Sequence, residues 1–338
     1  MPNANLFCAL RAAFPSDLDS VAVDAIDALP PRRYSWRELE QTSARLANLL
    51  GSLALPPGSR IAVQAEKSVE ALMLYLAVLR AGHVYLPLNT AYQAAEIDYF
   101  VGNAEPGAIV CSPRNLAWTL PIAARAGCTN VFTLADDGQG GTLMERAAAF
   151  GDAQTPVQTQ PDDTASIIYT SGTTGRSKGA MLSHRNLLSN ALTLKRYWDW
   201  QPNDVLIHAL PIFHVHGLFV AIQGALLNGS TMRWFSKFDP KLAIAQMARA
   251  TVFMGVPTLY GRMLAEPALT RAACASMRLF ISGSAPLLVE TFDAWAERSG
   301  HVILERYGMS ETVMLTSNPC RAGDGVRRRG TVGPALPE

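Results

Sequence analysis

The stretch Tyr169-Thr-Ser-Gly-Thr-Thr-Gly-Arg-Ser-Lys-Gly179 contains no aliphatic side chain, yet it lies between two short apolar runs, Ala165–Ile168 and Ala180–Leu182. This pattern predicts a loop held between two strands. Three glycines allow the backbone N–H groups to turn inward, the hydroxyl groups add donors, and Lys178 adds a positive charge. These features favour a phosphate-binding loop. The alternative is a solvated hairpin loop without a ligand.

The order of residues in this loop is more specific than its composition. It is not a Walker A loop, because Lys178 is preceded by Ser177 and followed by Gly179. It closely resembles the signature of the adenylate-forming superfamily, which includes acyl-CoA synthetases, luciferases and the adenylation domains of peptide synthetases. Members of that superfamily use ATP to convert a carboxylate into an acyl-adenylate. The resemblance implies ATP binding by Thr170, Ser171, Gly172, Thr173, Thr174, Gly175 and Lys178.

Composition narrows the class of protein. The chain has 338 residues, 49% of them apolar, and its 29 Lys and Arg nearly balance its 28 Asp and Glu, so its charge gives no reason to expect a nucleic-acid partner. The longest apolar run, Ala71–Leu79, is shorter than the roughly 20 residues that span a bilayer. Without a signal-like N-terminus, the sequence predicts a cytoplasmic protein. The five cysteines are far apart and indicate buried thiols rather than a zinc site or disulfides.

Helical and strand patterns alternate from about residue 35, which predicts an α/β fold with mostly parallel sheets. The resemblance implies the large N-terminal domain of the acyl-adenylating fold, with two subdomains at about 1–163 and 164–338. Ser35-Trp-Arg-Glu38 has the pattern of a capping box and predicts a helix start. We expect strands at 60–65, 84–88, 108–111, 205–210, 230–235, 251–255, 279–282 and 302–305. We expect helices at 35–50, 66–79, 95–100, 183–198, 217–227, 240–248, 257–264 and 287–299.

Two histidines occur in Pro211-Ile-Phe-His-Val-His-Gly217, which follows a predicted strand. In an extended segment His214 and His216 would face the same side. They could be metal ligands, but no third ligand is close in sequence, so we interpret His214 as structural. His216 matches the superfamily's histidine near the carboxylate and the α-phosphate, which implies a functional role.

Small residues follow the next predicted strand end, in Ile281-Ser-Gly-Ser-Ala-Pro286. They would permit close approach of a flat ring, although packing between a strand and a helix would also explain them. The resemblance assigns Gly283, Ser284 and Ala285 to the adenine side of the nucleotide site.

A third strand end carries Glu305-Arg-Tyr-Gly-Met-Ser-Glu311, which offers an aromatic ring for stacking and a carboxylate for Mg²⁺. The resemblance implies that Tyr307 packs on adenine, that Ser310 contacts the α-phosphate and that Glu311 binds Mg²⁺. It also places Glu305 and Arg306 among the ATP-binding residues. A carboxylate at a helix N-terminus is the alternative for Glu311.

The amino-acid sequences of these motifs resemble those of malonyl-CoA synthetases. A dicarboxylate substrate requires a buried cation for the carboxylate that does not react. The resemblance assigns that role to Arg262 with Ser284 beside it. Arg306 and Arg278 are further candidates because both flank strand ends. Val215 and Met309 would line the acyl pocket.

The resemblance implies ligation of malonate, or methylmalonate, to CoA with ATP and Mg²⁺, and with Lys178, His216 and Glu311 as the catalytic residues. The family continues beyond Glu338 with a ribose-binding Asp and a C-terminal lysine, so we expect this chain alone to be impaired. One alternative is a ligase for another short or aromatic carboxylate. Another is a nucleotide- or acyl-binding fragment without turnover.

Overall fold

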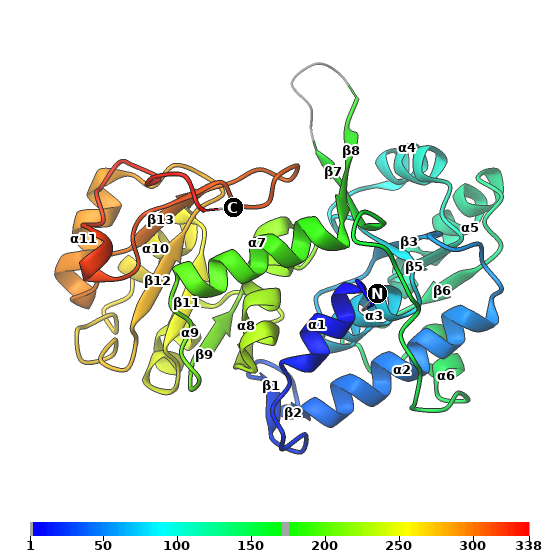
Figure 1. Cartoon of the computed structure of the whole chain (residues 1–338), viewed down its shortest axis with the longest axis horizontal. Helices are drawn as coiled ribbons and strands as arrows, with labels where there is room; N and C mark the ends of the chain where they lie inside the picture. Colours follow the sequence, from blue (N-terminus) through cyan, green and yellow to red (C-terminus); the bar gives the residue numbers. More distant parts are fainter. Residues whose placement is uncertain (1–2, 171–175, 338) are drawn as a thin grey trace. The chain divides into compact units, whose positions relative to one another are not determined.

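The computed structural model describes residues 3–170 and 176–337. The chain forms two compact units. The first unit consists of Met1–Ala12, Ser35–Leu188 and Ile212–His214, and the second unit consists of Ala13–Tyr34, Ser189–Pro211 and Val215–Glu338. Figure 1 traces both from blue to red along the sequence.

A six-stranded sheet forms the centre of the first unit, in the order β6-β5-β3-β4-β7-β8. Its ladders are parallel except for the antiparallel pair β7 and β8. The strands are β3 (Arg60–Gln64), β4 (Val84–Pro87), β5 (Ala108–Cys111), β6 (Val131–Thr133), β7 (Thr164–Thr170) and β8 (Lys178–Ser183).

Among the residues of this unit that the structure describes, six α-helices and a short 3₁₀ turn accompany the sheet. They are α1 (Leu6–Ala12), α2 (Trp36–Ser52), α3 (Val69–Arg80), α4 (Ala94–Ala104), η1 (Pro113–Asn115), α5 (Leu116–Arg125) and α6 (Thr142–Ala147). Helix α3 is buried at every residue, in keeping with a sequence that is apolar except at Glu70 and Arg80. Ser35 caps α2: Glu38 N–H donates to Ser35 Oγ at 3.1 Å, and Ser35 N–H donates to Glu38 Oε2 at 2.7 Å. The predicted capping box is confirmed.

An eight-stranded sheet forms the centre of the second unit, in the order β14-β13-β12-β11-β9-β10-β1-β2. Neighbouring strands are parallel along the part β13-β12-β11-β9-β10-β1 of this order, whereas β14 is antiparallel to β13. The strands are β1 (Val21–Ala25), β2 (Arg32–Ser35), β9 (Val205–His208), β10 (Thr231–Trp234), β11 (Val252–Gly255), β12 (Leu279–Ser282), β13 (Leu304–Tyr307) and β14 (Thr316–Ser317).

Helix α7 (His184–Tyr197) begins in the first unit and ends in the second unit. The other helices of the second unit are the π-helical η2 (His216–Ile222), α8 (Gln223–Asn228), α9 (Pro240–Gln246), η3 (Met247–Arg249), α10 (Pro257–Leu264), α11 (Val289–Ser299) and η4 (Ala322–Asp324). The core that α10 and α11 share with the sheet is aromatic. Tyr260 meets Trp295 edge to face, with ring centroids 4.8 Å apart, and Phe280 meets Trp295 at 5.0 Å. Such contacts fix the helices on the strands.

The prediction of an α/β fold with mostly parallel sheets is confirmed. The division into units differs from the expected boundary near residue 163, because β7 pairs with β4 of the first sheet and β1 pairs with β10 of the second. Strands β1, β2, β6 and β14 and helices α1 and α5 were not expected from the sequence, and most of them are short. The strand expected at 302–305 lies two residues later, as β13.

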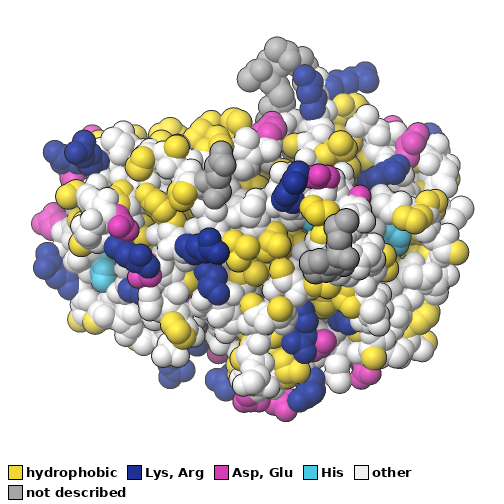
Figure 2. Space-filling model, viewed as in Figure 1, with side chains coloured by type: hydrophobic (Ala, Val, Ile, Leu, Met, Phe, Trp, Pro, Cys, Tyr) yellow, Lys and Arg dark blue, Asp and Glu magenta, His cyan; other side chains and the backbone are white. Residues whose placement is uncertain are grey.

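All five cysteines are free thiols; three of them are buried and Cys8 and Cys320 are half-buried. Within residues 3–170 and 176–337, no helix combines the length and the apolar character needed to cross a bilayer. On the face that Figure 2 shows, Lys and Arg side chains are spread out rather than gathered in one stripe.

Candidate active site

Four residues that were predicted from the sequence lie at the carboxyl ends of parallel strands in the second unit: Gly283, Ser284, Arg306 and Tyr307. Strand β12 ends at Ser282, just before Gly283 and Ser284, and β13 ends with Arg306 and Tyr307. Residues that follow neighbouring parallel strands lie at one edge of the sheet, which is the usual place for a ligand in this type of fold.

His216 begins the π-helical segment η2 and is buried, with 4% of its surface exposed. The chain turns sharply there: a Cβ on Gly217 would lie 2.0 Å from the carbonyl oxygen of Pro211, so only glycine fits. The carbonyl of Gly217 lies 3.0 Å from Nε2 of His208, and the His208 ring stacks on Trp234 at 4.8 Å. His208, which was not predicted from the sequence as a site residue, supports this turn from the end of β9.

Ser284 contacts His216 across the strand ends. Its Oγ lies 3.3 Å from Nδ1 of His216. Ser284 has φ of +71°, a left-handed conformation that is uncommon for residues other than glycine. Backbone strain of this kind is concentrated at functional sites, where the surrounding structure holds it in place. Ser284 is an exposed residue beside the buried ring of His216.

Gly283 lies directly on the guanidinium group of Arg306. A Cβ at residue 283 would come within 2.5 Å of Arg306 Cζ. Gly283, which was expected to allow a nucleotide ring to approach, therefore also makes room for the guanidinium group of Arg306. Close approach of two chain segments is a recognised reason for glycine at a strand end.

Arg306 is the buried cation of this site. It is 2% exposed, and its Nε and Nη2 atoms have no hydrogen-bond partner among the described residues. Burial lowers its pKa to about 9, although the nearby Tyr260 acts in the opposite direction. The group is therefore cationic at neutral pH. A buried, unpaired charge is costly, so this arrangement favours an anionic ligand.

Glu305 points away from solvent and is 4% exposed. Its Oε1 accepts a hydrogen bond of 3.0 Å from the N–H of Leu287, which fixes the segment before α11. Burial raises the pKa of Glu305, and the Leu287 N–H partly opposes this effect. Oε2 has no hydrogen-bond partner within the described part of the chain.

The segment after β13 folds back on the strand. The N–H of Leu315 donates to the carbonyl of Tyr307 at 3.0 Å, and a Cβ on Gly308 would lie 1.9 Å from the carbonyl oxygen of Val313. Tyr307 and Met309 are exposed by 44% and 42%, so both side chains are accessible to a ligand.

Glu311 lies in this returning segment and is exposed. No group of three or more potential metal ligands occurs among the described residues. This does not conflict with the expected Mg²⁺, because that ion is commonly held by one or two carboxylates together with substrate phosphates and water. The exposed carboxylate of Glu311 fits that type of site.

Two of the three candidate arginines differ from expectation. Arg262 on α10 is exposed rather than buried; its guanidinium lies 4.8 Å above the Phe238 ring and 3.4 Å from the Phe238 carbonyl. Arg278 precedes β12 and so lies at its amino end, opposite the predicted site. It forms an ion pair with Asp204, whose side chain is 1% exposed. Arg278 is therefore a structural cation.

The predicted phosphate loop belongs to the first unit. The two strands expected on either side of it are β7 and β8; they pair in antiparallel fashion, and the last pair joins Thr170 to Lys178. Thr170 is half-buried and Lys178 is exposed. The predicted residues Ser171, Gly172, Thr173, Thr174 and Gly175 lie outside the described residues.

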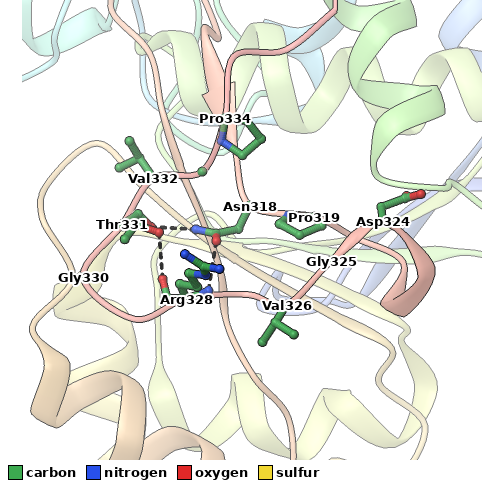
Figure 3. A pocket seen from close by; sticks show the side chains of 11 residues that line it. Asn318, Pro319, Asp324, Gly325, Val326, Arg328, Gly330, Thr331, Val332 and Pro334 are labelled. Atoms are coloured by element: carbon green, nitrogen blue, oxygen red, sulfur yellow. Dashed lines mark hydrogen bonds between the residues drawn. The ribbon is translucent and has the colours of Figure 1, made fainter.

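A separate hollow of about 610 Å³ opens in the loop from Asn318 to Pro334. Figure 3 shows Asn318 between Arg328 and Thr331. The Oδ1 atom of Asn318 accepts from the N–H of Arg328 at 3.0 Å, and its Nδ2 donates to the carbonyl of Thr331 at 2.6 Å. None of the lining residues is among those predicted from the sequence, so the hollow is distinct from the strand-end site.

The site and fold together agree with one family of enzymes. The chain belongs to the AMP-binding enzyme family, which matches residues 12–338. The resemblance to adenylate-forming enzymes is thereby confirmed. The chain is 30% identical to a mitochondrial malonate–CoA ligase of Bos taurus, over 90% of this chain and 54% of that protein.

Solved structures agree with this assignment. The ATP-bound MatB of Rhodopseudomonas palustris is 52% identical, with a TM-score of 0.93, over 99% of this chain and 65% of that one. A malonyl-CoA ligase with methylmalonyl-CoA and AMP bound is 32% identical, with a TM-score of 0.79, over 98% of this chain and 66% of that one. The chain thus spans about half to two thirds of the length of these relatives.

Proposed function

We propose that this chain carries the nucleotide and acid sites of an ATP-dependent acid–thiol ligase that uses malonate. Membership of the AMP-binding family and similarity to malonate–CoA ligases support the reaction class. The observation that carries the choice of acid is Arg306, a buried guanidinium at the end of β13 whose Nε and Nη2 have no hydrogen-bond partner among the described residues.

A dicarboxylate suits Arg306 better than a simple fatty acid. One carboxylate reacts, and the other accepts hydrogen bonds from the guanidinium, which suits carboxylates because of its planar donors. A neutral acyl tail would leave the buried charge unpaired. Arg306 is therefore our first choice for the residue that holds the distal carboxylate. Arg262 is exposed and comes second.

In the first proposed step, a malonate carboxylate oxygen attacks the α-phosphorus of ATP. The new P–O bond replaces the bond to the β-phosphate, so diphosphate leaves and malonyl-adenylate forms. Lys178 and the N–H groups of its loop would bind phosphate oxygens, and Ser310 would donate to the α-phosphate. Mg²⁺, held by Glu311, would neutralise phosphate charge.

His216 would border the reacting carboxylate. Its Nδ1 lies 3.3 Å from Ser284 Oγ, which limits rotation of the ring. Tyr307 would stack on adenine beside Gly283 and Ala285, while Val215 and Met309 would line a small acyl pocket. In the second step the CoA sulfur attacks the acyl carbon, AMP leaves with the former P–O–C oxygen, and the thiol proton passes to solvent.

The test measures diphosphate release by this chain with Mg·ATP and malonate, methylmalonate, acetate, benzoate or no acid, alongside calorimetric ATP binding. We expect ATP binding, and release that depends on malonate or methylmalonate. Binding without release for any acid would favour the nucleotide-binding alternative. Faster release with acetate or benzoate would favour a ligase for another carboxylate and would overturn the role of Arg306.

A further inference from the structure

Helix α4 contacts β7 and the residue just before β8 in the hairpin that carries the phosphate loop. Figure 1 shows the helix beside the hairpin of β7 and β8, within the first unit. Two α4 residues one turn apart, Tyr99 and Asn103, make the polar contacts. Residues four apart lie on the same face of a helix, so both side chains point toward the hairpin.

Each α4 side chain holds a different strand end. The Tyr169 hydroxyl, on β7, donates to Asn103 Oδ1 at 2.6 Å. The Tyr99 hydroxyl donates to the carbonyl of Ser177, the residue before β8, at 2.7 Å. Tyr169 directly precedes Thr170, and Ser177 directly precedes Lys178. The two hydrogen bonds therefore fix the last pair of the ladder from both sides.

Ring contacts reinforce these hydrogen bonds. The Tyr169 ring lies 4.5 Å from that of the buried Phe100, also on α4, and meets Tyr99 edge to face at 6.4 Å. The guanidinium of Arg176 lies 5.6 Å above the Tyr99 ring. Burial is the main cause that raises the pKa of Tyr169 to about 12, so its hydroxyl remains a donor at physiological pH.

We propose that Tyr99 and Asn103 are positioning residues that hold Thr170 and Lys178 in place for the triphosphate of the nucleotide. This inference rests on the proposed function for its ligand. The contacts themselves do not depend on that function. A phosphate site gains affinity when its donors are already fixed before binding, since less freedom is then lost.

Variants can separate positioning from general stability. Tyr99→Phe removes only the hydroxyl, and Asn103→Leu removes the acceptor at similar size. Asn103→Asp keeps an acceptor for Tyr169 and serves as the conservative rescue. Tyr92→Phe is the matched control, because the Tyr92 ring also packs on Phe100, at 5.0 Å, while its hydroxyl has no hydrogen-bond partner among the described residues.

The first readout is limited trypsin digestion, which cuts after Arg176 and after Lys178. Mass spectrometry gives the rate at each bond relative to cuts elsewhere. Loss of one hydrogen bond should open the strand end more often, so cleavage at these two bonds should rise about two- to tenfold in Tyr99→Phe and Asn103→Leu. Tyr92→Phe and Asn103→Asp should match the parent chain, and all Tm values should stay close to it.

The second readout is the ratio of Kd values for adenosine and Mg·ATP. Adenosine carries no phosphate, so displaced loop ends should weaken only ATP binding and lower the ratio about two- to tenfold. Unchanged cleavage rates would overturn the inference whatever the binding results. Faster cleavage with an unchanged ratio would overturn the positioning role. If the parent chain does not bind Mg·ATP, the proposed function is wrong and the positioning role is wrong with it. The cleavage rates still test separately whether Tyr99 and Asn103 hold the strand ends.

Discussion

The hydroxyl of Ser284 lies 3.3 Å from Nδ1 of His216, and it is held there by a left-handed backbone at Ser284. Replacement by glycine removes the strain and the hydroxyl together, while replacement by alanine removes only the hydroxyl. Left-handed conformations cost non-glycine residues about 1–2 kcal/mol. We therefore expect Ser284→Gly to be more stable than Ser284→Ala by about that amount in urea unfolding. Equal stabilities would show that the backbone is unstrained. Both variants should slow malonate-dependent diphosphate release.

Gly283→Ala should disturb Arg306 without touching its charge. The new methyl group would lie 2.5 Å from Cζ of a buried guanidinium that has little room to move. Overpacking of this kind typically costs about 1–3 kcal/mol. The check is a double-mutant cycle with Arg306→Ala, which removes the group that clashes. The double variant should be less destabilised than the sum of the single variants, and strict additivity would contradict the contact.

The roles of Arg306 and Arg262 can be separated by comparing Arg306→Met with Arg262→Leu. Hydrogen bonds to charged groups contribute about 1.5–3 kcal/mol, so Arg306→Met should weaken malonate use about 10- to 150-fold. Arg262→Leu should have a smaller effect, since that side chain is exposed. The measurement is kcat/KM for malonate beside the Kd for Mg·ATP. A larger loss in Arg262→Leu, with a shift toward longer monocarboxylates, would restore the assignment made from the sequence.

Arg278 should matter for stability rather than for substrate. It pairs with Asp204, which also accepts hydrogen bonds of 2.7 Å from Thr251 Oγ1 and from the Gln201 N–H. Arg278→Met leaves a buried carboxylate without its cation, a change that typically costs about 3–5 kcal/mol. Because Asp204 keeps its hydrogen bonds from Thr251 and Gln201, we expect a loss of stability at the lower end of that range. Urea unfolding measures the loss, while the Kd for Mg·ATP of the folded variant should be unchanged. A stable variant with weakened nucleotide binding would refute this view.

Acidification should weaken the attachment of α1 in the first unit. Nδ1 of His184 accepts the N–H of Leu6 at 3.1 Å, and burial lowers the pKa of His184 from 6.5 to about 4 although Asp163 opposes the effect. The unfolded chain therefore binds this proton first. The stabilising contribution is complete above pH 6.5 and is lost as the pH falls toward 4. Its upper limit is ~3 kcal/mol, from about 1.4 kcal/mol per pKa unit.

The measurement for His184 is the unfolding free energy between pH 8 and pH 4, compared with His184→Gln. The variant should have a smaller slope between pH 6.5 and pH 4, since its side chain does not titrate. Identical slopes would mean that His184 is not the titrating group.

Much of the local structure around the candidate site could be predicted from the sequence. The string from Tyr169 to Gly179 predicted a loop between two strands, and β7 and β8 lie on either side of it. Small residues after β12 and the Tyr-Gly turn after β13 were also predictable, because such residues permit turns and close approach that others prevent. The alternation of strand-like and helix-like stretches predicted the α/β class, since apolar residues recur at different intervals in buried parallel strands and in amphipathic helices.

The tertiary structure decided which arginine is buried and which partner each one has. Arg262, Arg278 and Arg306 are equivalent in sequence, since each lies near a predicted strand or helix end. The fold exposes Arg262, pairs Arg278 with Asp204 and buries Arg306 against Gly283. Likewise, no local pattern links Tyr99 to Ser177. Burial and pairing depend on segments far apart in the chain, and only their packing brings those segments into contact.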